Sequence, residues 1–289
     1  MGWALRIGHV GSRSLSSVAQ LSSTWDLDAF RRKAFEPARP AKLPLGGEHI
    51  PPACSKWFVS NDSDGLALDP LFWSKFKDAT VTTSSRSFHR SEAPLAILLA
   101  YLSQQQSELG KRGSRSGVSV YLAQCSLGSL PEELQDDLPT PEMVLRAGKG
   151  DVYESSLWLG DASSYTPLHR DPNPNLFMQL AGRKELRLLP PEAGDALFEA
   201  IQESLWQQGR LISPGSAAFR GEKMMTGPEA DLLHEAVWQE GTRASELMQA
   251  YGQRVEVSGQ EALFIPKHWW HSVKGVGRGV TASVNWWFR

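Results

Sequence analysis

The sequence predicts a mainly β protein, a double-sheet jelly roll or barrel with flanking helices, and three observations support this prediction. Eight short segments after residue 152 combine strand-type patterns with Gly, Pro or Asn punctuation. They cover residues 156–160, 165–170, 176–180, 185–189, 255–257, 262–265, 272–276 and 280–288. The chain has 289 residues, 41% of them hydrophobic, which is enough for one substantial core. Helical patterns lie either before this series of strands or in one insert within it.

The segments outside the strands follow the same logic. We expect helices over residues 25–35, 73–76 and 94–106, and a strand over residues 118–124. Residues 25–117 would form a mixed, largely helical segment packed on a barrel of residues 118–289. An insert over roughly residues 192–254, between the fourth and fifth core strands, would carry helices over residues 195–208 and 229–251.

The N-terminal segment, residues 1–24, differs in composition from the rest. It contains no Asp or Glu, two arginines (Arg6 and Arg13) and several serines. Such acid-poor, Arg- and Ser-containing leaders are typical of mitochondrial transit peptides, and a disordered tail is the alternative. We therefore expect a dispensable segment and a mitochondrial location, with cytoplasm or nucleus as the alternative.

Charge and cysteine content exclude several classes. The net charge is −2, so no global basic field is available to hold DNA, and RNA is an alternative that we do not favour. A local basic cluster is conceivable at Arg183, Lys184, Arg187 and Arg220. No apolar run is long enough to cross a bilayer, so no membrane partner is expected. Cys54 and Cys125 form no Cys-x-x-Cys pair, which argues against a zinc finger or a disulfide framework.

A His-x-Asp pair, His169 and Asp171, indicates a metal site. Side chains two residues apart share one face of an extended strand. His271, from a distant strand, would complete a two-histidine, one-carboxylate triad, which is typical of non-haem Fe(II) oxygenases. His268 competes for this role, but in an extended segment it would point away from the face that His271 occupies. A zinc hydrolase with the same ligands is chemically feasible, although no activated base is evident.

Five separated motifs resemble those of the JmjC-type cupin hydroxylases, and within that family the nearest resemblance is to the asparaginyl hydroxylase that inhibits hypoxia-inducible factor. The resemblance covers roughly residues 25–289 in order. The motifs are His169-x-Asp171, Asn175-Leu-Phe-x-Gln-Leu-x-Gly182-x-Lys184, Leu188-Leu-Pro-Pro191, Leu263-Phe-Ile-Pro-x-x-Trp-Trp-His271 and Val284-Asn285-x-Trp287.

The resemblance implies a double-stranded β-helix that holds Fe(II) and 2-oxoglutarate and uses O₂. By motif position, Lys184 would pair with the distal carboxylate of 2-oxoglutarate, and the hydroxyls of Thr166 and Tyr121 would bond to the same carboxylate. Asn175 and Asn285 would lie near the metal and the keto-acid end. A buried dianion needs such a fixed cation and donors because an unpaired buried carboxylate is costly. As alternatives, Lys184 could be an exposed strand residue, Tyr121 could pack in the core, and Asn175 could be a turn residue.

The resemblance also implies the activity, hydroxylation of a protein side chain or another macromolecule with release of succinate and CO₂. An Asp rather than a Glu at position 171, and no chromatin-reader module, favour a hydroxylase over a lysine demethylase. The alternatives are a tRNA-base hydroxylase and a catalytically silent cupin that only binds a partner. We expect Trp270, Trp286 and Trp287 to wall the pocket or to pack in the core.

Overall fold

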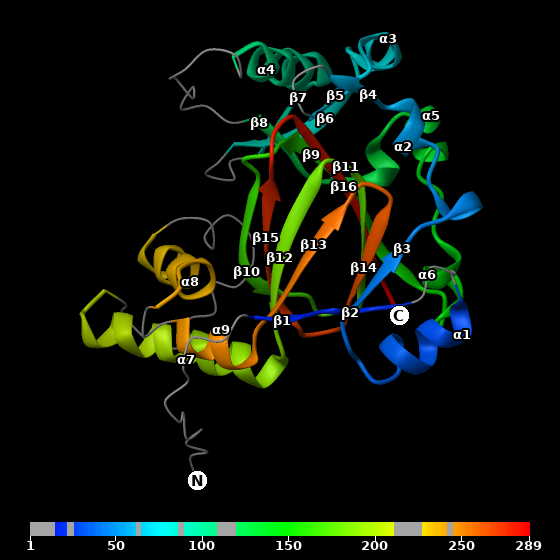
Figure 1. The fold of residues 1–289 in the computed structure, drawn as a ribbon. Helices are drawn as coiled ribbons and strands as arrows, with labels where there is room; N and C mark the ends of the chain where they lie inside the picture. Colours follow the sequence, from blue (N-terminus) through cyan, green and yellow to red (C-terminus); the bar gives the residue numbers. More distant parts are fainter. Residues whose placement is uncertain are drawn as a thin grey trace.

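The protein is a jelly roll of two facing β-sheets with helices on its outside (Figure 1). The structure, a computed structural model, describes residues 15–21, 26–61, 65–85, 90–108, 120–210, 227–241 and 245–289. The eight core strands are β9 (Val152–Asp161), β10 (Tyr165–Arg170), β11 (Asn175–Ala181), β12 (Arg183–Leu189), β13 (Gln253–Ser258), β14 (Glu261–Ile265), β15 (Trp270–Val276) and β16 (Val280–Phe288). Each contains one of the eight predicted segments, so these predictions are confirmed.

The order of pairing shows why this is a double-stranded β-helix. The first core strand pairs with the last (β9 with β16), the second with the seventh (β10 with β15), the third with the sixth, and the fourth with the fifth, all antiparallel. One sheet has the order β1-β13-β12-β15-β10, and the other has the order β2-β3-β14-β11-β16-β9-β8-β6-β7. This nested antiparallel pairing in two sheets is the jelly-roll arrangement, so the predicted fold class is confirmed.

The segment before β9 packs on the outer face of the larger sheet. There the buried side chains of Phe30, Trp57, Trp73 and Leu98 share one apolar cluster with those of the sheet. Its strands are β3 (Ala41–Pro44), β4 (Phe58–Asn61), β5 (Gly65–Leu68), β6 (Thr80–Ser85), β7 (Arg90–Pro94) and β8 (Val120–Ser126). Its helices are α1 (Leu27–Phe30, continued as a π-helix over Arg31–Phe35), α2 (Ala53–Lys56), α3 (Pro70–Trp73), α4 (Leu95–Glu108), α5 (Glu132–Asp136) and α6 (Glu142–Arg146).

Three helices between β12 and β13 cover the smaller sheet: α7 (Pro191–Gln207), α8 (Pro228–Trp238) and α9 (Glu246–Tyr251). The prediction of one helix over residues 229–251 is wrong, because the backbone becomes extended at Gln239 and Gly241 has a φ of 80°, a conformation that favours glycine. No helix in the described ranges is long and apolar enough to cross a membrane. Cys125 is buried and Cys54 is half-buried, and the two do not form a disulfide bond.

Part of the predicted leader lies on the barrel. β1 (Ser16–Ser17) pairs in parallel with β13, and β2 (Ala19–Gln20) pairs in parallel with β3. Val18, between them, is 7% exposed and packs in a cluster with side chains of the barrel interior. Residues 1–14 and 22–24 lie outside the described residues. A dispensable leader would therefore end before Leu15 and not at residue 24.

A chain that begins at Trp25 is expected to be less stable than one that begins at Leu15. Burying a valine side chain stabilises a fold by about 1.5–3 kcal/mol, so the loss should be at least about 1.5 kcal/mol. Urea unfolding of the two chains measures the difference, and Val18→Ala in the longer chain should reproduce part of it. Equal unfolding midpoints would show that β1 and β2 contribute nothing.

Candidate functional site

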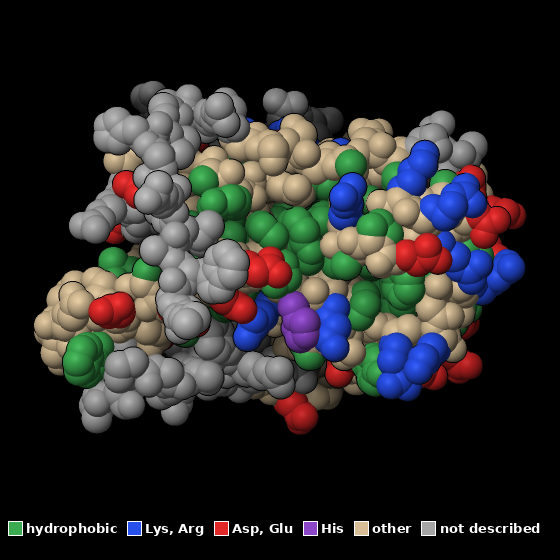
Figure 2. Space-filling view, turned by 90° about the horizontal axis from the view of Figure 1, so that it is seen from below, with side chains coloured by type: hydrophobic (Ala, Val, Ile, Leu, Met, Phe, Trp, Pro, Cys, Tyr) green, Lys and Arg blue, Asp and Glu red, His purple; other side chains and the backbone are tan. Residues whose placement is uncertain are grey.

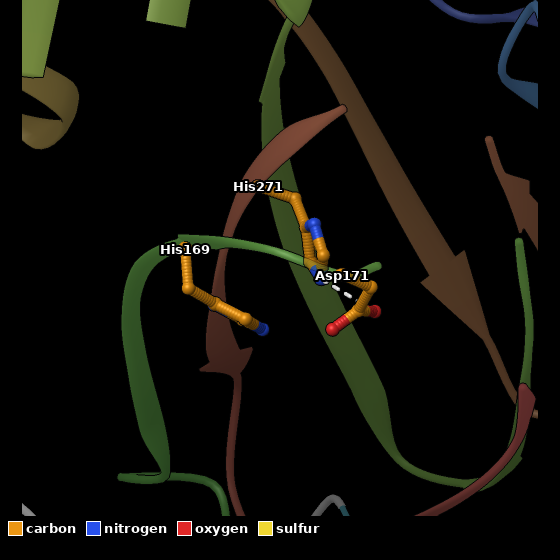
Figure 3. Close-up of side chains that lie close together, drawn as sticks. All are labelled: His169, Asp171 and His271. Carbon is orange, nitrogen blue, oxygen red and sulfur yellow. Dashed lines mark ion pairs between the residues drawn. The ribbon is translucent and has the colours of Figure 1, made fainter. Parts of the chain in front are cut away.

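The three predicted metal ligands meet in one place. His169 lies in β10, Asp171 follows directly after the end of that strand, and His271 lies in β15 opposite His169. One ligand atom from each residue lies within 4.8 Å of the others. The side chains converge in Figure 3, where the Nε2 of His271 is 3.7 Å from the Oδ2 of Asp171. This is the only such group of three or more His, Cys, Asp or Glu side chains that the described part of the chain contains.

A β-bulge in β10 directs His169 inward. Thr166 pairs with Val273 and His169 pairs with His271. An advance of three residues along β10 therefore matches an advance of two residues along β15. In a regular strand, residues 166 and 169 would point to opposite faces, but the extra residue turns both side chains into the same pocket. Pro167 lies within the bulge, where a residue without an N–H is tolerated.

Both imidazoles are oriented by their own strands. The Nδ1 of His169 lies 2.8 Å from the carbonyl oxygen of Pro167, and the Nδ1 of His271 lies 3.1 Å from that of Trp269. A carbonyl oxygen can only accept, so each Nδ1 carries the proton and each Nε2 keeps its lone pair. Burial and the neighbouring His169 lower the pKa of His271, which keeps its imidazole neutral. Two neutral Nε2 atoms and one carboxylate form a donor set for a divalent metal.

The carboxylate of Asp171 is held by two donors. Its Oδ2 accepts from the indole N–H of Trp287 at 2.7 Å and from the amide of Asn175 at 3.0 Å. The amide of Asn285 in turn donates to the Oδ1 of Asn175 at 2.9 Å. Burial disfavours the charged carboxylate, but His271 and His169, where they are protonated, and the two donors favour it, and the net effect lowers the pKa of Asp171. Asp171 is therefore ionised at neutral pH.

Lys184 lies deeper in the same barrel. Its side chain is buried, its Nζ donates to the hydroxyl of Ser283 at 2.7 Å, and it lies 5.6 Å from the ring centre of Phe177. No carboxylate of the described residues lies within ion-pairing distance of Nζ. Burial alone lowers the pKa of Lys184 to about 7. Such a lysine fits a site for an anionic ligand, because a ligand carboxylate would restore the missing charge partner.

One pocket joins Lys184 to the metal ligands. It holds about 440 Å³ of space, part of it open to solvent. Of the predicted cosubstrate contacts, Thr166 and Tyr121 both line it. Gly160 of β9 makes room for the ring of Tyr121, since a Cβ there would lie 2.4 Å from the Cδ2 of that ring. The lining residues are Tyr121, Trp158, Ser164, Tyr165, Thr166, His169, Asn175, Phe177, Lys184, Leu186, Ile265, His271, Val273, Ser283, Asn285 and Trp287.

The remaining sequence predictions concern the competing histidine, three tryptophans and two asparagines. His268 is exposed and takes no part in the His-Asp-His cluster, but it lies in a turn with a φ of 67° before β15 and not in the extended segment that the sequence argument assumed. Trp286 packs in the large apolar cluster and Trp270 packs against α7, so neither lines the pocket, and only Trp287 of the three does. Asn175 donates to Asp171 and accepts from Asn285, a role in orienting the carboxylate that the sequence interpretation did not include.

One pocket residue that we missed, Ser283, could have been found from strand periodicity. Ser283, Asn285 and Trp287 alternate along β16 and therefore share its inner face. Their side chains bond to Lys184, Asn175 and Asp171, respectively. Once Asn285 is placed in the site, the period of two predicts that Ser283 and Trp287 accompany it.

Comparison with known proteins agrees with this architecture. Residues 46–289 match the family model of the cupin-like domain. Jumonji C domain-containing protein 5 of Drosophila melanogaster is 26% identical over 267 residues, 90% of this chain and 57% of the relative. Lysine-specific demethylase JMJ30 of Arabidopsis thaliana is 28% identical over 168 residues (58% and 33%), and HSPB1-associated protein 1 of Homo sapiens is 28% identical over 139 residues (46% and 23%). The chain thus spans less than two thirds of each of these relatives.

Because the family model covers most of its length, this chain belongs to the cupin-like domain family, of the JmjC type that its relatives represent. The family assignment made from sequence motifs is therefore confirmed. JmjC proteins are in general Fe(II)- and 2-oxoglutarate-dependent oxygenases, and the His169, Asp171 and His271 cluster together with the buried Lys184 fits both groups.

Trp287→Phe is expected to weaken metal binding by about ten- to a hundredfold, the usual cost of losing a partner that orients a ligand. Phenylalanine keeps most of the ring but removes the N–H that donates to Asp171. Calorimetric titration of metal-free protein with Mn(II) or Co(II) gives the affinity. Trp286→Phe, one residue away on the opposite face, is the matched control and should bind as the unmodified protein does. Equal affinities for both variants would remove Trp287 from the site.

Proposed function

We propose that this protein is an Fe(II)- and 2-oxoglutarate-dependent dioxygenase that hydroxylates a protein side chain and releases succinate and CO₂. The observation that carries the proposal is one pocket with the metal-ligand cluster at one place and a buried lysine at another. Leu188 pairs with His271 and lies four residues beyond Lys184 on β12. Along the strand, the position of Lys184 is therefore about 13 Å from the position opposite His271. A dicarboxylate held by Lys184 would thus extend toward the metal.

Each residue has a defined role in this proposal. When bound, Fe(II), 2-oxoglutarate and O₂ would supply the oxidising chemistry, with one oxygen atom of O₂ going to the substrate and the other to succinate. His169, Asp171 and His271 would hold the metal through two imidazole nitrogens and one carboxylate oxygen. Asn175 and Trp287 hold Asp171 in one orientation. Lys184, aided by the hydroxyls of Thr166 and Tyr121, fixes the remote carboxylate of the cosubstrate.

The substrate can be found by mass spectrometry. Proteomes of cells with the enzyme and of cells carrying Asp171→Ala should differ by single-oxygen mass shifts at specific peptides. A synthetic peptide of the modified sequence should then stimulate succinate formation. If neither proteome nor peptide shows an added oxygen, the hydroxylase assignment fails.

Lysine demethylation is the second candidate, because several relatives carry the name lysine-specific demethylase. Hydroxylation of an N-methyl group releases formaldehyde, whereas hydroxylation of a side-chain carbon does not. Release of formaldehyde from methyl-lysine peptides, with no oxygen added to unmethylated peptides, would favour demethylation over our proposal.

The surface supports a protein partner rather than a nucleic acid. On the face seen in Figure 2, basic and acidic side chains are interspersed and do not form one continuous basic band. The formal net charge is −2. RNA binding, the alternative, would appear as retention on RNA that falls steeply with salt.

We also propose that the N-terminal segment directs the protein to mitochondria, on its acid-free composition with Arg6 and Arg13, and that any part removed ends before Leu15. A fusion of residues 1–25 to a fluorescent protein should enter mitochondria. Diffuse fluorescence would contradict the proposal and favour cytoplasm or nucleus.

Binding of 2-oxoglutarate is expected to weaken as the pH rises above about 7. The free lysine loses its proton through that range, since burial lowers the pKa of Lys184 to about 7. A bound carboxylate needs the charged form, so binding at higher pH must take up a proton, and affinity should fall by roughly tenfold per pH unit. Below pH 7 the lysine is already charged and this dependence disappears. Titrations of metal-saturated protein in buffers with different ionisation enthalpies measure the affinity and the proton uptake together.

A further inference from the structure

The outer face of the metal-binding strand pair carries a cross-strand pair of its own. On the inner face, His169 of β10 lies opposite His271 of β15. The next residues along, Arg170 and Trp270, also lie opposite each other, and successive side chains point to opposite faces of a sheet. The guanidinium of Arg170 lies over the ring of Trp270, 5.2 Å from its centre. The two pairs thus lie back to back.

Asp195 of helix α7 binds both members of this outer pair. Its Oδ1 accepts from the Nη1 of Arg170 at 2.6 Å and from the indole N–H of Trp270 at 2.9 Å. One carboxylate oxygen therefore connects the two strands that carry the histidine ligands.

The helix around Asp195 is fixed against the same tryptophan. Gly194 lets α7 approach closely, since a Cβ at that position would lie 2.0 Å from the Cδ1 of Trp270. Phe198, one turn further, stacks on the Trp270 ring with centroids 5.8 Å apart and planes at 23°. The residues on both sides of Asp195 thus fix this part of α7 against Trp270. Through its hydrogen bonds, Asp195 can then hold β10 and β15 at a fixed separation.

We propose that Asp195 is a positioning residue for the metal site, which acts through Arg170 and Trp270 to fix the spacing of His169 and His271. This inference rests on the proposed function, because it assigns the two histidines to a metal. It also gives the helical insert a second role, since the insert then sets the affinity of the metal centre in addition to covering the sheet.

The solvent exposure of the ion pair between Arg170 and Asp195 distinguishes a role in metal binding from a role in overall stability. The side chains of Arg170 and Asp195 are 39% and 42% exposed, and exposed ion pairs contribute little to stability. Loss of this ion pair in Asp195→Asn, which keeps an acceptor for the buried indole N–H of Trp270, should therefore leave the melting temperature nearly unchanged. Its effect should appear in metal binding, which depends on the separation of two ligand atoms.

Calorimetric titration of metal-free Asp195→Ala with Co(II) tests the proposal, with the Co(II) absorption spectrum as a second readout. Affinity should fall by about three- to tenfold, less than for a residue that bonds directly to a ligand, and the spectrum should change. Asp195→Asn keeps an acceptor for Trp270 but loses the charge that Arg170 binds, so its loss should be smaller. Arg170→Gln should weaken binding too, and the double variant should lose less than the sum of the two single losses.

Glu256→Gln is the matched control. It breaks a comparable surface ion pair, Arg183 with Glu256 at 3.1 Å, on the same sheet but at the end of β12 remote from the histidines. Co(II) affinity equal in Asp195→Ala and Glu256→Gln, with unchanged spectra, would overturn the positioning role. If the unmodified protein and His169→Ala bound Co(II) equally well, the proposed metal site itself would be wrong.

Discussion

Replacement of His169 or Asp171 by alanine is expected to abolish 2-oxoglutarate turnover while the fold remains. Each change removes one of three ligands whose donor atoms lie within 4.8 Å. Neither side chain belongs to the apolar clusters that stabilise the barrel, so the melting temperature should change little. Succinate formation, measured by mass spectrometry with a cell extract as the substrate source, is the readout.

His268→Ala is the matched control for this experiment. His268 is exposed, three residues from His271, and lies outside the metal cluster. Its loss should leave at least half of the turnover. Turnover that survives in Asp171→Ala, or that is lost in His268→Ala, would show that the ligand set is wrongly assigned.

Lys184→Ala is expected to raise the apparent KM for 2-oxoglutarate by about ten- to a hundredfold, because a charge-assisted contact in a dry pocket contributes about 1.5–3 kcal/mol. Metal affinity should barely change, since the nitrogen of Lys184 bonds to Ser283 and not to a metal ligand. Lys184→Arg should restore only part of the affinity, because a planar guanidinium does not replace a compact ammonium without rearrangement.

Lys274→Ala controls for the loss of a lysine from the same sheet. Lys274 lies over the ring of Trp238 at 4.2 Å, and it does not line the pocket. Its removal should leave the KM for 2-oxoglutarate within about twofold of the unmodified value. An equal effect of both variants would reduce Lys184 to a contributor to general charge.

The barrel could be predicted from sequence because its strands are short, alternating and separated by turn residues. Turn signals and alternation are local, and they were sufficient to find all eight core strands. β1 and β2 could not be found in this way, since each has two residues and forms only by pairing with strands that are distant in sequence. Pairing of this kind is a tertiary effect that leaves no local pattern.

In the site, too, local motifs could be read from the sequence, whereas features that depend on tertiary contacts could not. Motifs fix the spacing of His169, Asp171, His271 and Lys184, and the structure brings all four to one pocket or to the His-Asp-His cluster beside it. The bulge that turns both Thr166 and His169 inward could not be predicted, since it depends on the register between β10 and β15. The contacts of Asp195 depend on how an inserted helix docks on the sheet.

One pocket is expected to bind a metal and 2-oxoglutarate together, and anaerobic titration of 2-oxoglutarate into the protein with and without Fe(II) measures this. We expect one 2-oxoglutarate per chain, with tight binding only when Fe(II) is present. His271→Ala should remove the dependence on metal, and Lys184→Ala should weaken binding while metal is still held. Equal 2-oxoglutarate binding in the metal-free protein, the Fe(II)-loaded protein and Lys184→Ala would show that this pocket does not bind the metal and 2-oxoglutarate together.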